Sequence, residues 1–247
     1  MPQSKINIRA AVSGEGVNMK HINIAIDGPG GAGKSTISKE VAKRLGIIYV
    51  DTGALYRTVG YFARENGLSL SDVKVSELIT PLLDKITIGI GYVEGTQHVY
   101  LNGEDLGDKI RQPDISMYAS AVSSVPSVRA FLLETQKELA KKNSVIMDGR
   151  DIGTVILPNA DVKIFLTASS EARAERRYRE LVAKGQNVKY EDVLNEMNER
   201  DHADSTRAAA PLKAADDAIL FDNSGYTFEG SVEHVLGLIK ERTGGKK

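Results

Sequence analysis

The chain has 247 residues, of which 41% are hydrophobic and 26% charged, a composition typical of a globular α/β protein with a buried core. Its formal net charge of -1 gives no basic field that would draw it to nucleic acid, and no apolar run reaches the roughly 20 residues that span a bilayer. With no cysteine it has neither disulfides nor cysteine-ligated zinc, which suits the cytoplasm where we expect the protein to work.

Residues 1–19 predict a mobile N-terminal tail. They contain Lys5, Arg9 and Glu15 and no continuous apolar stretch, so they do not resemble a signal peptide. Met19 stands directly before the first strand-like segment and is an alternative start, which leaves open whether residues 1–18 belong to the native protein.

From residue 21 onward, strand-like and helix-like segments alternate. β-branched residues over 21–27 and 47–50 predict strands, and apolar residues at helical spacing over 35–45 and 53–63 predict helices. This order is typical of a parallel sheet covered by helices.

A different pattern follows at residues 86–101, where apolar residues recur with a period of two. With turns at 94–96 and 102–103, it predicts a small antiparallel hairpin that interrupts the strand–helix order. Beyond it, the apolar pattern predicts helices over 115–140, divided by Pro126, and over 169–200 with a break at 184–185, strands at 144–147, 162–166 and 218–221, and a closing helix at 232–239.

Residues 28–35, GPGGAGKS, fit the phosphate-loop pattern G-x-x-x-x-G-K-[ST] between a predicted strand and a predicted helix. Glycines allow successive backbone N–H groups to surround a phosphate, the lysine neutralises charge, and the hydroxyl of Ser35 can bind Mg²⁺. The predicted triphosphate-binding residues are Gly28, Gly30, Gly31, Ala32, Gly33, Lys34, Ser35 and Thr36.

Two further motifs should lie at the carboxyl ends of strands, where open α/β sheets bind ligands. DTGALYR at 51–57 presents Arg57 as a bidentate clamp for a second phosphate, although an ordinary exposed helix arginine is the alternative. DGRD at 148–151 follows a buried strand, and a simple capping turn is its alternative. Arg173, Arg176 and Arg177 share one predicted helix, which suits a flap that stabilises phosphoryl charge.

Together the motifs IDGPGGAGKST, DTGALYR, MDGRDIGT, KIFLTASSEARAERR and RDHADSTRAAAPL resemble the bacterial cytidylate kinases, a family of nucleoside monophosphate kinases, over residues 23–240. The resemblance implies a three-layer P-loop NTPase fold with a parallel sheet, a small antiparallel monophosphate-domain insert and a helical lid. It divides residues 20–247, as a single kinase unit, into a core (about 20–70, 113–168 and 208–247), an insert (about 71–112) and a lid (about 169–207).

The resemblance also implies residue roles. The residues around the acceptor phosphate would be Thr52, Tyr56, Arg57 and Arg150. Cytosine would be recognised by Ser120, Arg129, Asp151 and Arg207. The ribose would lie beside Arg200 and Asp204. The implied catalytic residues are Lys34, Arg57, Arg150 and the lid arginines Arg173, Arg176 and Arg177.

The implied activity is Mg²⁺-dependent transfer of the γ-phosphoryl group of ATP to CMP or dCMP by a monomer that needs no nucleic acid and no membrane. Gly30 and Gly31 replace the family's usual serine or alanine, a change expected to be harmless because the loop works through its backbone. Residues 222–225 differ from the family's usual text, which weakens any statement on the donor base.

Other functions agree less well with the sequence than this one. A kinase for uridylate, adenylate or shikimate is disfavoured by the insert and by DGRD, and a nucleotide switch by the lack of an N-K-x-D guanine-reading motif. A nucleic-acid-binding protein conflicts with the near-zero net charge.

Overall fold

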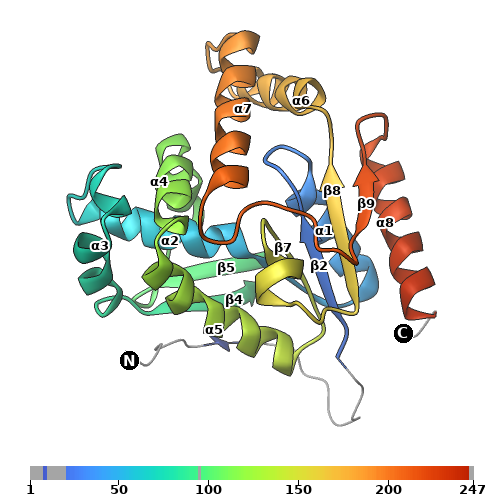
Figure 1. The fold of residues 1–247 in the computed structure, drawn as a ribbon, viewed down its shortest axis with the longest axis horizontal. Helices are drawn as coiled ribbons and strands as arrows, with labels where there is room; N and C mark the ends of the chain where they lie inside the picture. The colour runs from blue at the N-terminus through green and yellow to red at the C-terminus, as the bar shows by residue number, and fades with distance from the viewer. Residues whose placement is uncertain (1–7, 10–20, 94–95, 245–247) are drawn as a thin grey trace. The chain divides into compact units, whose positions relative to one another are not determined.

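The computed structural model of the protein describes residues 8–9, 21–93 and 96–244 (Figure 1). The chain forms two compact units. Residues 22–49 and 145–247 make up one, called the sheet unit here, and residues 1–21 and 50–144 make up the other, called the hairpin unit.

A five-stranded sheet forms the centre of the sheet unit, with the strand order β3-β7-β2-β8-β9. The strands are β2 (Asn23–Asp27), β3 (Ile48–Asp51), β7 (Val145–Gly149), β8 (Val162–Thr167) and β9 (Ile219–Asp222). β2 runs parallel to both β7 and β8, with Ile24 opposite Ile146 on one side and Val162 on the other. These central strands are almost fully buried, which explains their continuous apolar sequence.

Two helices pack on this sheet and close its core. Apolar side chains of α1 (Lys34–Leu45) and α8 (Phe228–Thr243) join those of β2, β7 and β8 in one buried cluster. α1 ends at Gly46, whose φ of 67° belongs to the left-handed region that glycine enters without strain.

The remaining helices of the sheet unit are α6 (Ser170–Ala183) and α7 (Tyr190–Thr206), which pack against each other. The hydroxyl of Ser169 accepts a hydrogen bond from the backbone N–H of Ala172 and so caps the start of α6. The predicted break is present after Lys184, where Gly185 has a φ of 75°.

The hairpin unit combines a four-stranded sheet with helices. The sheet order is β1-β4-β5-β6, in which β1 (Ile8–Arg9) runs parallel to β4 (Ile88–Val93), and β5 (Thr96–Leu101) runs antiparallel to both β4 and β6 (Glu104–Asp105). The predicted hairpin is therefore present. Of its turn at 94–96, residues 94 and 95 lie outside the described residues. The second predicted turn has positive φ at Asn102 and Gly103.

The helices of this unit are α2 (Thr52–Glu65), α3 (Ser76–Leu83), α4 (Pro113–Ser123) and α5 (Pro126–Lys142). α2 packs closely on α4, and the close approach requires glycine at position 60. A Cβ atom added at Gly60 would lie 2.9 Å from the Tyr118 Cβ. Pro126 begins α5 at a position where its missing N–H costs nothing, and it divides the predicted helical stretch as expected.

The predicted α/β fold, with a parallel sheet and a small antiparallel sheet, is confirmed. The sequence pattern did not predict α3, the short 3₁₀ helices η1 (Asp72–Lys74) and η2 (Gly107–Arg111), or the π-helical turn η3 (Ile152–Ile156). Of the predicted tail, the structure describes only Ile8 and Arg9 in β1, and the rest of the tail lies outside the described residues. The division into core, insert and lid stays a prediction. Within the described ranges, every helix is too short or too polar to cross a membrane.

Candidate active site

The phosphate loop joins β2 to α1 and takes its shape from glycine. Gly28, Gly31 and Gly33 have φ angles of 147°, 74° and 87°, values that other residues rarely adopt. Because no side chain caps α1, its first backbone N–H groups are available to an anion at the positive end of the helix. Gly31 therefore does more than the sequence analysis expected, since its backbone conformation favours glycine.

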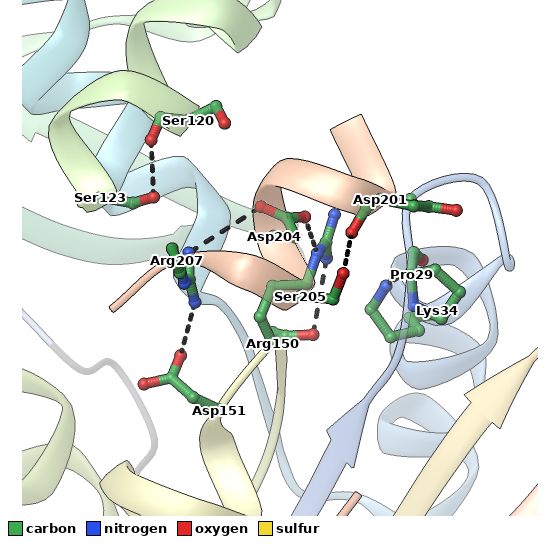
Figure 2. A network of polar contacts seen from close by, with 12 residues as sticks. Pro29, Lys34, Ser120, Ser123, Arg150, Asp151, Asp201, Asp204, Ser205 and Arg207 are labelled. Carbon is green, nitrogen blue, oxygen red and sulfur yellow. Dashed lines mark hydrogen bonds and ion pairs between the residues drawn. The ribbon is translucent and has the colours of Figure 1, made fainter. Parts of the chain in front are cut away.

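Lys34 begins α1 and is only 5% exposed. Its Nζ donates a hydrogen bond of 2.7 Å to the carbonyl oxygen of Pro29 (Figure 2). Burial and the nearby Arg150 guanidinium lower the pKa of Lys34 well below its usual value, and Arg200 adds to this effect, while Asp148 and Asp27 oppose it. Several cations thus converge on one buried place, an arrangement that suits a polyanionic ligand.

Asp148 lies near the end of β7, and its carboxylate accepts a 2.7 Å hydrogen bond from the Ser35 hydroxyl and a 2.9 Å bond from the Tyr49 hydroxyl. Asp148 belongs to the DGRD motif, but no role was predicted for it. A hydroxyl and a carboxylate side by side are oxygen ligands of the kind Mg²⁺ takes, so Ser35 and Asp148 fit that ion. The place of Asp148 beside Ser35 could have been predicted from the sequence, because an acidic residue near the end of a strand next to the phosphate-loop strand is a known position for a Mg²⁺ ligand.

Asp27, the last residue of β2, was also missed. Its two carboxylate oxygens accept hydrogen bonds of 2.7 Å from the backbone N–H groups of Ile152 and Gly153. Burial raises the pKa of Asp27 to about 6, and Asp151 adds to the rise, although the two backbone hydrogen bonds and Lys34 lower it. This carboxylate therefore fixes the start of the phosphate loop to the segment that follows DGRD.

Four of the predicted acceptor-binding residues form one chain of alternating charges (Figure 2). Arg150 Nε lies 2.8 Å from Asp204 Oδ2, and Arg207 lies 3.9 Å from the other oxygen of Asp204 and 3.8 Å from Asp151. Arg207 also donates from Nε to the carbonyl oxygen of Ala210. The four side chains come from the end of β7 and from α7 and its end, and all are largely buried.

The three predicted lid arginines have different surroundings. The guanidinium of Arg173 is 5% exposed and is anchored to the carbonyl oxygens of Ala168 and Gly30, to the Ser170 hydroxyl and, at 2.7 Å, to Asp201. Arg177 is more exposed and pairs with Glu180 on its own helix.

Arg176 donates to both the side-chain oxygen and the carbonyl oxygen of Asn223. The amide nitrogen of Asn223 in turn donates to the carbonyl oxygen of Ala32 in the phosphate loop. Asn223, which is 2% exposed, therefore joins Arg176 to the loop, a contact that the unusual sequence at 222–225 did not reveal.

In the hairpin unit, Thr52, Tyr56 and Arg57 lie in the first turns of α2. Asp51 precedes them, where one carboxylate oxygen accepts from the N–H of Ala54 and the other accepts a 2.7 Å bond from Arg57 Nη2. Arg57 Nε is buried and has no hydrogen-bond partner among the described residues, so it can donate to a ligand.

The other two predicted residues of this unit lie on α4 and α5. The guanidinium carbon of Arg129 lies 5.9 Å from the centre of the Tyr56 ring, and its Nη1 donates to the carbonyl oxygen of Ser123. The Ser123 hydroxyl donates to the carbonyl oxygen of Ser120 (Figure 2). Within this unit the structure thus brings Arg129 to Tyr56, one helix turn from Thr52.

A parallel sheet, a phosphate loop between its central strand and a helix, and an acidic residue beside the loop's serine define a P-loop protein that handles nucleotide phosphates. The sequence model described as Cytidylate kinase matches residues 24–241. The chain belongs to the cytidylate kinase family, which confirms the resemblance seen in the sequence motifs.

Relatives agree with this assignment. The chain is 53% identical over 220 residues to a cytidylate kinase of Caldicellulosiruptor bescii, covering 89% of this chain and 96% of that protein. It is 48% identical over 219 residues to one of Thermosipho melanesiensis, covering 89% and 97%. Among solved structures, a shikimate kinase of Bacteroides thetaiotaomicron is 13% identical with a TM-score of 0.45, covering 89% and 98%.

Proposed function

We propose that this chain transfers the γ-phosphoryl group of ATP to CMP or dCMP, giving ADP and CDP or dCDP. Membership of the cytidylate kinase family makes it a nucleoside monophosphate kinase, an enzyme with nucleotide substrates. The observation that carries the proposal is that the phosphate loop shares its unit with the buried arginines Arg150 and Arg207, which are held by acidic partners. An anionic acceptor needs cationic side chains in addition to the loop that holds the triphosphate.

In the reaction, an oxygen of the acceptor's phosphate forms a bond to the γ-phosphorus, and the bond from that phosphorus to the bridging oxygen of ADP breaks. Little covalent chemistry is left to the protein, which must position two anions and stabilise the charge that spreads over the transferring group. The backbone N–H groups of the phosphate loop and the Nζ of Lys34 supply this stabilisation on the donor side. Water must be excluded, because it would otherwise accept the phosphoryl group.

Ser35 and Asp148 would hold Mg²⁺. When bound with ATP, the ion would supply positive charge that offsets the negative charge of the phosphates. The Ser35 hydroxyl and the Asp148 carboxylate are already hydrogen-bonded to each other, so the two oxygens are oriented before any ion arrives.

On the acceptor side, we assign the phosphate of CMP to Thr52, Tyr56, Arg57 and Arg150. Arg57 supports this role because its Nε is buried without a partner, so a phosphate oxygen would satisfy it. Arg150 supports it because a phosphate can take the place of the Asp204 carboxylate at its Nε.

We assign the base and the sugar to further polar side chains. Ser120, Arg129, Asp151 and Arg207 would read cytosine, and Arg200 and Asp204 would face the ribose. Buried polar groups that pair with the 4-amino edge of cytosine reject a base lacking it by up to roughly 10⁴-fold, since they would otherwise stay unpaired. The roles of Arg173, Arg176 and Arg177 at the triphosphate, the monomeric state and the cytoplasmic location stay predictions.

A coupled assay with ATP, Mg²⁺ and each of CMP, dCMP, UMP and AMP tests the proposal. We expect turnover with CMP and dCMP and much less with the other two acceptors. Comparable rates with UMP or AMP would contradict the choice of cytosine, and turnover that does not depend on any acceptor would contradict kinase activity. In the same assay, Arg57→Ala should raise the KM for CMP at least about tenfold while ATP still binds. An equal loss of ATP affinity would show that our division of the two sites is wrong.

A further inference from the structure

Gln97 is a polar residue on the apolar face of the β4–β5 hairpin. Side chains two residues apart on a strand share a face, so Gln97 lies on the same face as Val99 and Leu101, which are both buried. β5 also contacts α2, so this face of the hairpin is turned toward the helix that begins with Thr52. An amide at such a position needs hydrogen-bond partners.

The partners of Gln97 are the two backbone groups of a single residue. Its side-chain oxygen accepts a 2.8 Å hydrogen bond from the N–H of Asp51, and its side-chain nitrogen donates a longer bond of 3.4 Å to the carbonyl oxygen of Asp51. The side-chain amide of Gln97, which lies 46 residues further along the chain, therefore binds both backbone polar groups of Asp51.

Asp51 carries this constraint to Arg57. Its carboxylate caps α2 at Ala54 and also forms an ion pair of 2.7 Å with Arg57 Nη2, the two side chains being 17% and 22% exposed. Gly53 leaves the space that the pair needs. A Cβ atom added at Gly53 would lie 3.1 Å from Arg57 Nη1 and 3.2 Å from Asp51 Oδ1, so a larger residue there would press on the ion pair.

We propose that Gln97 is a positioning residue for the acceptor: through Asp51 it holds the Arg57 guanidinium in the orientation that receives the phosphate of the nucleoside monophosphate. The inference rests on the role of Arg57 in the proposed function and adds to it a task for the hairpin, which sets the affinity for the acceptor rather than only filling space. A fixed guanidinium loses less conformational entropy when it binds a phosphate, so the effect should appear in acceptor binding.

The test compares the steady-state kinetics of three variants at saturating Mg²⁺. Gln97→Met keeps the length of the side chain and removes both hydrogen bonds to Asp51. His98→Ala is the matched control, because it removes an ion pair with Asp105 from the opposite face of the same strand and touches neither Asp51 nor Arg57 in any contact described. Arg57→Ala is the reference for complete loss of the clamp.

We expect Gln97→Met to raise the KM for CMP by roughly threefold to tenfold, while kcat and the KM for ATP stay within about twofold. His98→Ala should leave all three constants within about twofold, even if its melting temperature falls as far as that of Gln97→Met.

Four results would overturn the inference. If Arg57→Ala raises the KM for CMP but Gln97→Met does not, the hairpin does not position the clamp and the proposed function stands. If Gln97→Met raises the KM for ATP and for CMP equally, or if His98→Ala matches its effect on CMP, the role of Gln97 is only structural. If Arg57→Ala itself leaves the KM for CMP unchanged, the assignment of Arg57 fails and the inference fails with it.

Discussion

The phosphate loop and the start of α2 hold their charged groups in different ways. In the loop, the shape comes from the backbone, since Gly28, Gly31 and Gly33 have positive φ and only Lys34 contributes a charged side chain. At α2, the important group is the end of a long side chain, and Asp51 with Gln97 keeps Arg57 in place. The first arrangement is encoded within eight consecutive residues, whereas the second needs residues from separate parts of the chain.

Substitution of Lys34 should have the largest effect on kcat, because Lys34 contributes the charged side chain of a loop that otherwise binds phosphate through its backbone. We expect Lys34→Met to lower kcat by about 10³-fold, since it removes stabilisation of the transferring phosphoryl charge. The urea midpoint should stay the same or rise, because an ammonium group buried at 5% exposure carries a desolvation cost that Met avoids. A variant with normal kcat, or one that loses activity only by unfolding, would contradict this view of the loop.

Two alanine substitutions within the loop separate backbone shape from side-chain space. At Gly28, a Cβ atom would lie 1.9 Å from the backbone oxygen of Leu166 and φ is 147°, so Gly28→Ala must distort the loop or β8. We expect kcat/KM for ATP to fall by about 10²-fold or more, at lower stability.

Gly30→Ala is the matched control for that variant. A Cβ atom at Gly30 would come no closer than 3.6 Å to Arg150 Nη2, an ordinary contact, and φ is not positive there. Its activity should stay within about twofold of the wild type. Equal losses in the two variants would show that the loop does not depend on its backbone in the way we describe.

Asp27→Asn should have a smaller effect that depends on pH. The carboxylate accepts two backbone hydrogen bonds and has a pKa of about 6 in the folded protein, against 3.8 for an unperturbed aspartate. As pH falls through about 6, protonation removes one acceptor, so we expect kcat/KM of the wild type to decline there. An asparagine has one acceptor at every pH, so the variant should be up to about tenfold less active at pH 8 and show no decline of this origin.

Stability should change in the opposite direction. Because the folded state binds the proton more tightly than the unfolded state, the contribution of Asp27 to the free energy of unfolding decreases as pH rises from about 4 to about 6, by roughly 2–3 kcal/mol. Urea denaturation of both proteins across this range should show the decrease in the wild type and not in Asp27→Asn. Parallel curves would mean that Asp27 has an ordinary pKa.

The sequence predicted the features that short segments encode. The phosphate loop, the buried parallel strands, the hairpin and the break at Pro126 each depend on residues within one element or turn, so periodicity and glycine placement were sufficient. The resemblance also implied that Arg150, Asp151, Asp204 and Arg207 bind one acceptor. Ion pairs connect these four side chains in the structure, and their roles at the acceptor stay predictions.

The missed features depend on residues far apart in the chain. Ser35 meets Asp148 across 113 positions, and Asp27 meets Ile152 across 125, so local spacing reveals neither pair. The same holds for Asn223, which reaches Ala32 across 191 positions. For Asp148 the available signal is its place near the end of a predicted buried strand. In each case a common polar residue acquires its role from the sheet that brings the two segments together, and propensity contains no information about that partner.

The buried guanidinium of Arg173 has a consequence for partial unfolding. This one side chain, at the beginning of α6, binds the carbonyl oxygens of Gly30 and Ala168 and the carboxylate of Asp201. It therefore links the phosphate loop, the beginning of α6 and the later part of α7 to one another. None of these segments can open to solvent without stranding a charged group or its acceptors. The nucleotide loop and the two helices should therefore exchange their protected amide protons as one cooperative unit, and a proteolytic cut in any of them would require all three to open.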